Sequence, residues 1–434
     1  MRVVEILLVE AIHRPGCLAK ILAVIGEFGA TVEGVNAVSR MDKDTIWEIT
    51  IEYDDPASVV KLADSINALD KTKIVGKSDR VFNRHSGGKI KMISQMEIGS
   101  LEVLRDLYTP GVARVCEAIQ KDPSKISDYT NIKNSVAIVT NGTAILGLGN
   151  IGPEAGLPVM EGKAAILSEL VGISGIPILL KENDPLRVIE AVEAISPSFG
   201  AILLEDIKAP ECFTIEEELI GRIDKPVFHD DQHGTAMVVL AALLTAARHV
   251  GVDVKDRVFG QLGLGAAGMG ICTLLKEYGV KDVLGCDVNE QANKKLRALG
   301  GQSVDLKTLM AKADVVVATT GVKDLIKPSM VRKGQIIMAL SNPDPEIMPE
   351  VALERGAIFA TDGKTVNNML AFPGMLRGTL NAGVGLITHE MKIAVSETLS
   401  SLAGDEELVP AALDKKVHQQ VATAVYQSAV KSHG

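Results

Sequence analysis

The chain is poor in aromatic residues, which make up 3% of its 434 residues and include a single tryptophan. Its hydrophobic core must therefore be built from valine, isoleucine, leucine and alanine, a composition that suits buried parallel strands. It also lacks an excess of basic charge. The formal net charge of -10 argues against a nucleic-acid partner, because proteins that bind nucleic acids are usually basic.

Long hydrophobic runs are missing as well. The longest, residues 236–247, is too short to span a bilayer and is predicted to be a buried helix. Glu5 and Glu10 interrupt the apolar N-terminus, which makes it a poor signal peptide. The five cysteines are odd in number and widely spaced, as expected of reduced thiols rather than a disulfide framework or a zinc cluster. We therefore expect a cytoplasmic protein with no membrane partner.

Three blocks follow one another along the chain. Residues 1–77 show the order βαββα and then a further apolar segment, and residues 78–94 are polar and glycine-containing, as in a linker. In residues 95–250, short apolar runs alternate with helical stretches, which predicts an α/β domain with a parallel sheet. The expected strands there are 136–139, 176–180, 201–204 and 227–228. Residues 251–434 begin with the same alternation.

A glycine-rich segment near the start of the third block predicts a Rossmann domain. The apolar run 258–262 leads into a G-x-G-x-x-G motif and an apolar helix, and Asp287 ends the next strand about 20 residues later. The glycines allow the pyrophosphate of a dinucleotide to approach the helix N-terminus, and the acidic residue binds the ribose. The predicted cofactor-binding residues are Gly263, Gly265, Ala266, Ala267, Gly268, Asp287, Thr320 and Asn342.

The identity of the dinucleotide depends on the charges beyond this strand. Asp287 would repel a 2′-phosphate, so we expect NAD. Lys294 and Lys295 lie one helical turn further on and leave NADP open.

Two acidic pairs follow two predicted strands of the second block. Glu205 and Asp206 come after the run 201–204, and Asp230 and Asp231 come after the run 226–229. Either pair alone could be a solvated strand end. Together they indicate a site for Mg²⁺ or Mn²⁺, because these ions prefer carboxylate oxygens and leave positions open for substrate.

These residues lie in motifs that resemble those of the malic enzymes, and more narrowly the short bacterial type. The likeness runs in order over roughly residues 95–400. The motifs are Tyr108-Thr109-Pro110-Gly111, Ile145 to Gly152, Met160-Glu161-Gly162-Lys163, Leu204 to Ile207, His229 to Ala236, Ser341-Asn342-Pro343, Asn367-Asn368 and Phe372-Pro373-Gly374.

The resemblance implies the oxidative decarboxylation of (S)-malate to pyruvate and CO₂ with reduction of NAD. Lys163 would bind substrate and act as the general base, Asp230 would hold Lys163, and Tyr108 would be the general acid. The remaining implied contacts are the metal ligands Glu205, Asp206 and Asp231 and the substrate contacts Asn342, Asn367 and Asn368. Burial can lower the pKa of a lysine, whereas the Asp230 carboxylate acts in the opposite direction.

The chain departs from the pattern of this family in four places. Ala144 stands where the large eukaryotic enzymes carry a substrate-binding arginine, and Asn141 stands where many relatives have aspartate. Asp344 replaces a usual threonine, and the segment 361–366 is shorter than the family's loop before the two asparagines. That loop borders the active site, so these departures bear on substrate preference.

Residues 1–77 resemble the ACT domain, a ferredoxin-like regulatory module. The motif is His13-Arg14-Pro15-Gly16-Cys17-Leu18, with histidine where the family usually has aspartate. Gly16 would let backbone amides meet a small effector at a helix N-terminus. A purely structural dimerisation module is the alternative, and either role implies a homodimer or a higher homo-oligomer.

Three other functions remain open from the sequence. A malolactic enzyme would use the same residues but yield lactate. An ACT-regulated amino-acid dehydrogenase would share the Rossmann motif and a lysine, although its chemistry needs no metal. An amino-acid sensor with a degenerate catalytic body would be expected to have lost some of the residues that are all present here.

Overall fold

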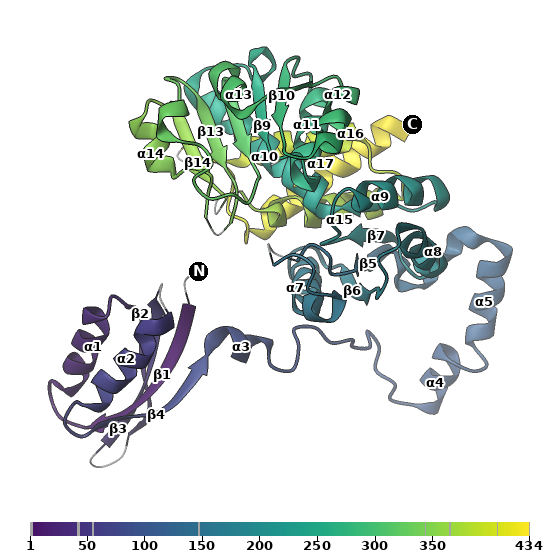
Figure 1. Ribbon diagram of the computed structural model, residues 1–434. Helices are drawn as coiled ribbons and strands as arrows, with labels where there is room; N and C mark the ends of the chain where they lie inside the picture. Colours follow the sequence, from purple (N-terminus) through teal and green to yellow (C-terminus); the bar gives the residue numbers. More distant parts are fainter. Residues whose placement is uncertain are drawn as a thin grey trace. The chain divides into compact units, whose positions relative to one another are not determined.

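The structure is a computed structural model that describes residues 3–40, 44–53, 56–145, 148–342, 344–363, 366–405 and 407–433. Five residues of the predicted motifs and of the short loop lie outside these ranges: Leu146, Gly147, Pro343, Lys364 and Thr365. The chain forms two compact units, residues 1–89 and 90–434 (Figure 1), and each is described by itself.

The first unit is a four-stranded antiparallel sheet with two helices. Its elements are β1 (Val3–Ile12), α1 (Cys17–Glu27), β2 (Thr31–Arg40), β3 (Asp44–Tyr53), α2 (Pro56–Asn67) and β4 (Thr72–Asp79). The strand order β2-β3-β1-β4 is that of a ferredoxin-like fold. Alternate residues of β1, namely Leu7, Val9 and Ala11, point into a core that also receives Ile21 and Ile25 of α1.

The predicted linker is more structured than its composition indicates. β4 extends to Asp79, and the short helix α3 (Arg80–His85) follows it. The boundary between the two units falls after Lys89.

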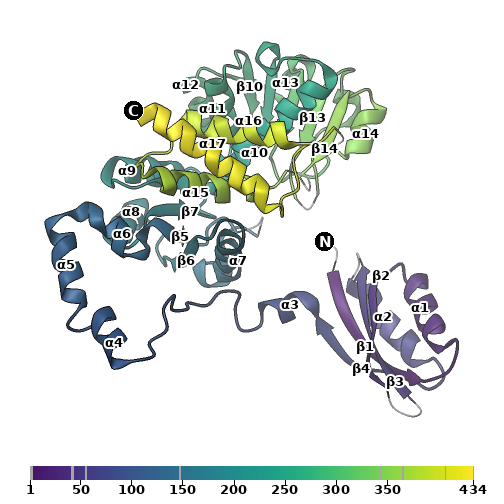
Figure 2. The same ribbon diagram turned by 180° about the vertical axis from the view of Figure 1, so that it is seen from behind.

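The second unit begins with a segment of short helices. These are α4 (Leu101–Leu107), α5 (Val112–Lys121), η1 (Pro123–Lys125), α6 (Ile126–Tyr129) and η2 (Asn131–Asn134). Ile132 is buried, and Arg377 Nη1 donates a hydrogen bond of 2.7 Å to Asn134 Oδ1. The chain is therefore anchored to the body of the unit at η2, whereas α4 and α5 stand apart from that body in two opposite views (Figure 1 and Figure 2).

The first parallel sheet of this unit has the order β6-β5-β7-β8, which confirms the predicted parallel α/β domain. Its strands are β5 (Ser135–Thr140), β6 (Ser174–Leu179), β7 (Ala201–Leu204) and β8 (Val227–His229). The connecting helices are α7 (Pro153–Val171), α8 (Pro185–Ile195), α9 (Glu211–Arg222) and α10 (Asp230–Val250), and η3 (Ser196–Ser198) follows α8. Leu204 at the end of β7 lies opposite His229 at the end of β8. The two acidic pairs therefore leave the sheet at one edge.

The second parallel sheet has the order β11-β10-β9-β12-β13-β14, the Rossmann arrangement that the glycine motif predicts. Its strands are β9 (Phe259–Leu262), β10 (Val283–Cys286), β11 (Gln302–Ser303), β12 (Val315–Ala318), β13 (Ile336–Ala339) and β14 (Phe359–Asp362). The helices around it include α11 (Ala266–Tyr278), α12 (Glu290–Ala298), α13 (Leu306–Lys312) and α14 (Pro349–Glu354).

A helical core joins the two sheets. After η6 (Asn368–Leu370), the chain returns through α15 (Phe372–Ala382), α16 (His389–Leu402) and α17 (Lys415–His433), and these helices share one hydrophobic cluster with α10 and both sheets. Among the described residues, α10 alone is long and apolar enough to cross a membrane by length and composition. The protein buries 72% of its most apolar window, which matches the predicted role as a core helix.

Candidate active site

Lys163 is a charged residue in the apolar stripe of α7. The buried positions of that helix include Met160, Lys163, Ala164 and Leu167, which recur at helical spacing toward the sheet. Lys163 is only 7% exposed, so its ammonium group needs compensating charge. Its Nζ donates a hydrogen bond to Asp230 Oδ2, lies 2.6 Å from Glu205 Oε1 and sits 4.5 Å from the ring centroid of Phe372.

The charges around Lys163 control its protonation. Burial by itself lowers the pKa of Lys163, but Asp230, Glu205 and Asp231 outweigh burial and raise the pKa above its ordinary value. The opposing effect of Asp230 that the sequence indicates is therefore the stronger one. Burial raises the pKa of Glu205 and Asp230 in turn, although Lys163 counteracts this for both carboxyls. In this arrangement the lysine is an ammonium ion paired with carboxylates.

Three carboxylates beside this lysine form a candidate metal centre. Glu205, Asp206 and Asp231 each offer one oxygen, and these oxygens lie within 4.8 Å of one another. Asp206 has a φ of 53°, in the left-handed region, which turns the chain sharply after β7. Its backbone N–H donates a 2.9 Å hydrogen bond to Asp231 Oδ2 and so ties the ends of β7 and β8 together.

The oxygens of this candidate metal centre suit a bound cation. Glu205 Oε2 is buried and accepts no hydrogen bond from any described residue. An unsatisfied buried carboxylate oxygen is costly, and a bound cation would remove that cost. The donor set consists of carboxylate oxygens, which suits Mg²⁺ or Mn²⁺.

Asp230 is the most enclosed member of the cluster. Its Oδ2 accepts hydrogen bonds from Lys163 and, at 2.7 Å, from Nδ2 of Asn368. A Cβ at position 234 would lie 1.9 Å from Asp230 Oδ1, so the motif requires glycine there. Of the two predicted asparagines, Asn368 reaches the cluster, whereas Asn367 caps η6 by accepting a 2.9 Å hydrogen bond from the Met369 N–H.

A second buried charge network supports the first turn of α10. Glu216 of α9 accepts hydrogen bonds from the His229 backbone N–H at 3.0 Å and from His233 Nε2 at 2.9 Å. Lys392 of α16 lies 3.1 Å from His233 Nδ1. A neutral imidazole with its proton on Nε2 satisfies both neighbours, since it donates to the carboxylate and accepts from the ammonium.

The electrostatics agree with that tautomer. Burial lowers the pKa of His233 to about 4 and that of Lys392 to about 8. Burial alone would raise the pKa of Glu216, but the hydrogen bond and charge from His233, with His229 and Lys392 nearby, bring it to about 2.

The sequence analysis missed this network, although its signal is a charged residue at an otherwise apolar position of a helix. Glu216 occupies the apolar stripe of α9 together with Cys212, Ile215 and Leu219. Lys392 lies likewise between buried positions of α16.

The glycine-rich loop has the backbone geometry expected of a dinucleotide site. A Cβ on Gly268 would lie 1.9 Å from the Gly263 carbonyl oxygen, and Gly263 itself has a φ of 83°. Gly265, Ala266 and Ala267 form the N-terminus of α11. Asp287 braces this loop by accepting hydrogen bonds from the Leu264 N–H at 2.6 Å and the Asn289 N–H at 2.7 Å.

Asp287 also lines a cavity of about 350 Å³ between α9 and α12. Pro210, Phe213 and Lys295 line the same cavity. The Lys295 ammonium lies 3.5 Å from the ring centroid of Phe213, within the range of a cation–π contact.

A buried carboxylate joins the ends of β12 and β13. Glu346 Oε1 accepts hydrogen bonds from the Thr320 N–H, the Thr320 hydroxyl and the Ser341 hydroxyl at 2.7, 2.8 and 2.6 Å. Asn342 Nδ2 donates to the Gly363 carbonyl oxygen at 3.4 Å. The structure thus places Thr320 and Asn342 at the carboxyl edge of the Rossmann sheet, the edge at which ligands bind in such sheets.

Tyr108 does not enter the buried cluster of this chain. It lies in the turn between α4 and α5 and is 70% exposed, whereas Lys163, Glu205 and Asp230 are all buried.

The departures from the family pattern have structural roles of their own. Asn141 accepts a hydrogen bond from the Thr143 hydroxyl at 2.7 Å, and the Ala144 N–H donates to the Asp206 carbonyl oxygen at 3.0 Å. Asp344 pairs with Lys323 at 3.1 Å on the surface.

Comparisons with known proteins show which families and solved structures the chain is similar to. The profile of the family described as "Malic enzyme, N-terminal domain" matches residues 88–187, and that of "D-isomer specific 2-hydroxyacid dehydrogenase, NAD binding domain" matches residues 233–330. The NAD-dependent malic enzyme 1 of Bacillus subtilis is 49% identical over 429 residues, covering 98% of this chain and 98% of that protein. The bifunctional malic/malolactic enzyme of the same organism is 42% identical over 80% of this chain and 90% of its own length. The crystal structure of malic enzyme from Pyrococcus horikoshii has a TM-score of 0.76 and 39% identity, covering 80% of this chain and 88% of that chain.

The buried network yields a prediction about stability. Replacing Glu216 by alanine leaves Lys392 without its counter-charge and the His229 N–H without its acceptor. Breaking a buried pair in this way typically costs about 3–5 kcal/mol of unfolding free energy. Glu217 is exposed on the same helix, so Glu217→Ala is the matched control and should stay within about 0.5 kcal/mol of the original chain. Urea unfolding measures both, and equal stabilities would contradict a stabilising role for Glu216.

Proposed function

This chain belongs to the malic enzyme family, and we propose that it catalyses the NAD-linked oxidative decarboxylation of malate to pyruvate and CO₂. One observation carries the proposal most directly: Lys163 lies buried between Asp230 and Glu205, beside a cluster of three carboxylates at one edge of a parallel sheet. This arrangement combines a base, a group that positions it and a set of oxygen ligands.

Lys163 is the proposed general base for the C2 hydroxyl of malate. Asp230 accepts hydrogen bonds from both Lys163 and Asn368, so the carboxylate fixes the ammonium in one place relative to α10. An ammonium ion cannot accept a proton, so Lys163 can act as the base only after it has lost its own proton, and a cation bound to the neighbouring carboxylates would favour that loss by offsetting their charge. Asn342 and Asn367 are proposed to contact substrate as well.

Glu205, Asp206 and Asp231 are the proposed ligands of Mg²⁺ or Mn²⁺. When bound, such a cation would offset the carboxylate charge next to Lys163 and withdraw electrons from the C2 oxygen of the substrate. Asp206 N–H and Asp231 are already linked, so this part of the site is preorganised by the chain itself.

NAD is the proposed cofactor, with NADP the less favoured alternative. Asp287 stands at the end of β10 beside the glycine-rich loop, where its negative charge disfavours a 2′-phosphate. Lys295 lines the same cavity and packs over Phe213, so its charge lies near that position. A kcat/KM that favours NADP over NAD would overturn this preference.

A coupled assay tests the function. With malate, Mn²⁺ and NAD, we expect an absorbance rise from NADH. Lys163→Ala should lower the turnover by roughly 10²–10⁴-fold, the usual contribution of a general acid or base. Lys181 is exposed on the surface, so Lys181→Ala should retain the original rate. Near-normal turnover in the Lys163 variant would exclude the assigned base.

Metal binding can be measured without turnover. Mn²⁺ titration followed by electron paramagnetic resonance should show tight binding to the original chain and strongly weakened binding to Asp231→Asn, because that change removes a ligand charge. Asp256→Asn alters an exposed carboxylate remote from the cluster and serves as the control. A chelator should abolish activity, and Mn²⁺ or Mg²⁺ should restore it. Equal Mn²⁺ affinity of the two variants would place the metal elsewhere.

A malolactic reaction is the second candidate. Its support is the 42% identity to a protein named bifunctional malic/malolactic enzyme. Lactate formation without an NADH signal would identify it.

We propose that the first unit is an ACT-like regulatory domain. A cavity of about 390 Å³ lies against the predicted motif and is lined by Ile12, His13, Arg14, Pro15, Gly16, Cys17, Leu18 and Trp47. His13 is held there by Thr45 Oγ1 at 2.9 Å and Arg40 at 3.0 Å, and Gly16 has a φ of 87° before α1. A small effector at this cavity would act through different affinities for two states of the enzyme.

The cytoplasmic location of the protein remains a prediction.

Removing the first unit tests this regulatory role. A chain of residues 90–434 should keep malate turnover, because the candidate catalytic groups all lie in the second unit. It should lose any response of malate affinity or turnover to amino acids or other small metabolites. A truncated protein that is folded and keeps the oligomeric state of the full chain, but is inactive, would show that the first unit belongs to the active site.

A further inference from the structure

His229 is the last residue of β8, and its side chain is completely buried. Successive side chains of a strand point to opposite faces of the sheet, so His229 points to the same face as Val227. Val227 packs there in one hydrophobic cluster with Cys212, Ile215 and Leu219 of α9. An apolar side chain at position 229 could pack on this face as well. The packing therefore does not by itself account for a histidine.

Neither ring nitrogen of His229 has a hydrogen-bond partner in the described part of the chain. A buried nitrogen without a partner is costly and calls for an explanation. The carboxylate of Asp231 lies beside the ring, with 3.5 Å between His229 Nε2 and Asp231 Oδ2. A normal N–H···O hydrogen bond is about 2.7–3.2 Å long, so a small rotation of either side chain would form one. The unpaired ring is thus aimed at a candidate metal ligand.

Asp231 is the least enclosed of the three candidate metal ligands. Its side chain is 32% exposed, whereas Glu205 and Asp206 are buried. A partly exposed carboxylate can rotate, so its orientation depends on the donors around it. The Asp206 N–H already donates a 2.9 Å hydrogen bond to Asp231 Oδ2. A second donor to the same oxygen would fix the carboxylate and leave its other oxygen for a cation.

His229 is not itself part of the ligand set. The three carboxylates offer oxygens within 4.8 Å of one another, and neither ring nitrogen of His229 belongs to that group. The backbone of His229 is held from the other direction, because its N–H donates a 3.0 Å hydrogen bond to Glu216. The residue therefore connects the buried Glu216 network to the carboxylate cluster.

We propose that His229 is a positioning residue of the metal centre: its Nε2–H donates to Asp231 Oδ2 and holds this carboxylate in the orientation that binds the cation. The inference rests on the proposed function, since it takes Asp231 as a ligand of Mg²⁺ or Mn²⁺. A carboxylate oxygen only accepts, so Nε2 carries the ring proton. Residues that orient metal ligands in this way typically contribute about 10–100-fold to metal affinity.

Two amide replacements test which ring nitrogen matters. The amide nitrogen of glutamine can reach the position of the histidine Nε2, whereas the shorter asparagine reaches only that of Nδ1. In Mn²⁺ titrations followed by electron paramagnetic resonance, His229→Gln should keep the original affinity and His229→Asn should lose about 10–100-fold. Original affinity in His229→Asn, or an equal loss in both variants, would overturn the inference.

Turnover and stability separate positioning from other roles. At saturating Mn²⁺, His229→Asn should regain a kcat close to the original, while the Mn²⁺ concentration for half-maximal rate rises by the same factor as the Kd. A kcat that stays low would place His229 in the chemistry itself and contradict the proposal. Urea unfolding without metal measures stability, and a variant that is only less stable, with unchanged Mn²⁺ affinity, would show a purely structural role.

The original chain provides a test that needs no folded variant at position 229. With ¹⁵N-labelled histidine and bound Mg²⁺, the His229 ring should be protonated on Nε2, and this proton should exchange slowly with solvent. Protonation on Nδ1 alone would rule out the hydrogen bond to Asp231.

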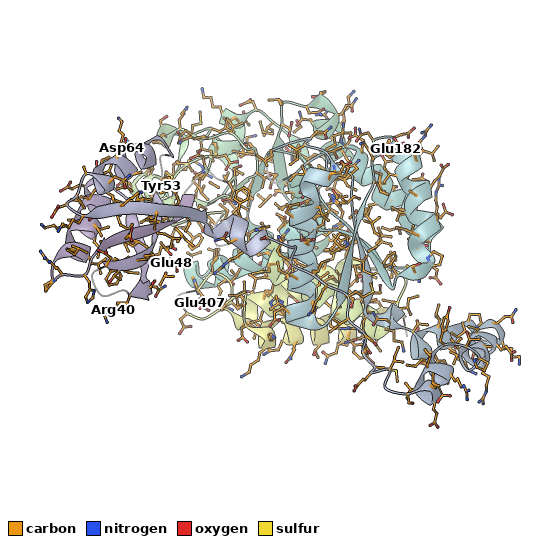
Figure 3. All side chains as sticks on the ribbon, turned by 90° about the horizontal axis from the view of Figure 1, so that it is seen from below. Arg40, Glu48, Tyr53, Asp64, Glu182 and Glu407 are labelled. Carbon is orange, nitrogen blue, oxygen red and sulfur yellow. The ribbon has the colours of Figure 1, made fainter. Side chains whose placement is uncertain are left out.

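Two exposed residues serve as controls. His249 lies in the last turn of α10, and Glu407 lies at the surface of the second unit between α16 and α17 (Figure 3). His249→Asn and Glu407→Gln should bind Mn²⁺ like the original chain. Asp231→Asn distinguishes the two levels of the argument: original affinity in that variant overturns the proposed metal site, whereas weak binding there with normal binding in His229→Asn overturns only the positioning role.

Discussion

The structure of the candidate active site depends on the burial of one positive charge. Moving an ammonium group out of water costs several kcal/mol, and this cost is recovered only when counter-charges and hydrogen bonds are in place. Lys163 finds them in Asp230 and Glu205, which come from the ends of two neighbouring strands. The packing of α7 against the sheet and the start of α10 at Asp230 are therefore coupled, because neither can move without leaving a buried charge unpaired.

The carboxylates around Lys163 must also be compensated for their burial. Four carboxylates, Glu205, Asp206, Asp230 and Asp231, gather around a single lysine, so the cluster has more negative than positive charge. The N-terminus of α10 favours two of these carboxylates through its dipole. Behind them, Glu216 binds the His229 N–H and reaches Lys392 through the neutral ring of His233. This second network holds the β8–α10 corner without adding net charge to the site.

The candidate catalytic and dinucleotide-binding regions are linked by direct helix packing. α10 begins at the acidic cluster and α11 begins at the glycine-rich loop, and the two helices touch at their first turns. A Cβ on Gly270 would lie 2.3 Å from the Gln232 carbonyl oxygen, so the helices approach as closely as their backbones allow. The two ligand regions therefore share a rigid core, with Asp287 and Glu346 bracing the loops on the Rossmann side.

The comparisons confirm the resemblance to malic enzymes, whose motifs lie on short segments that can be recognised residue by residue. The parallel sheets, the Rossmann order and the buried α10 could likewise be predicted, because each follows from local patterns: apolar runs, glycine spacing and helix periodicity. The βαββα order of the first unit follows from the same kind of pattern. The candidate metal ligands could be grouped because carboxyl ends of parallel strands meet at one edge of a sheet.

Other features were decided only by the tertiary structure. The net pKa shift of Lys163 depends on the distances of three carboxylates that lie far away in the sequence, and no local pattern sets those distances. Glu216, His233 and Lys392 come from three different helices, so their pairing appears only when α9, α10 and α16 pack together. Tyr108 is a further example, because its motif predicts a role as general acid, whereas the fold of this chain leaves its side chain 70% exposed. Local sequence determines which groups are present and on which element they lie, but the meeting of charges depends on long-range packing, which no short segment encodes.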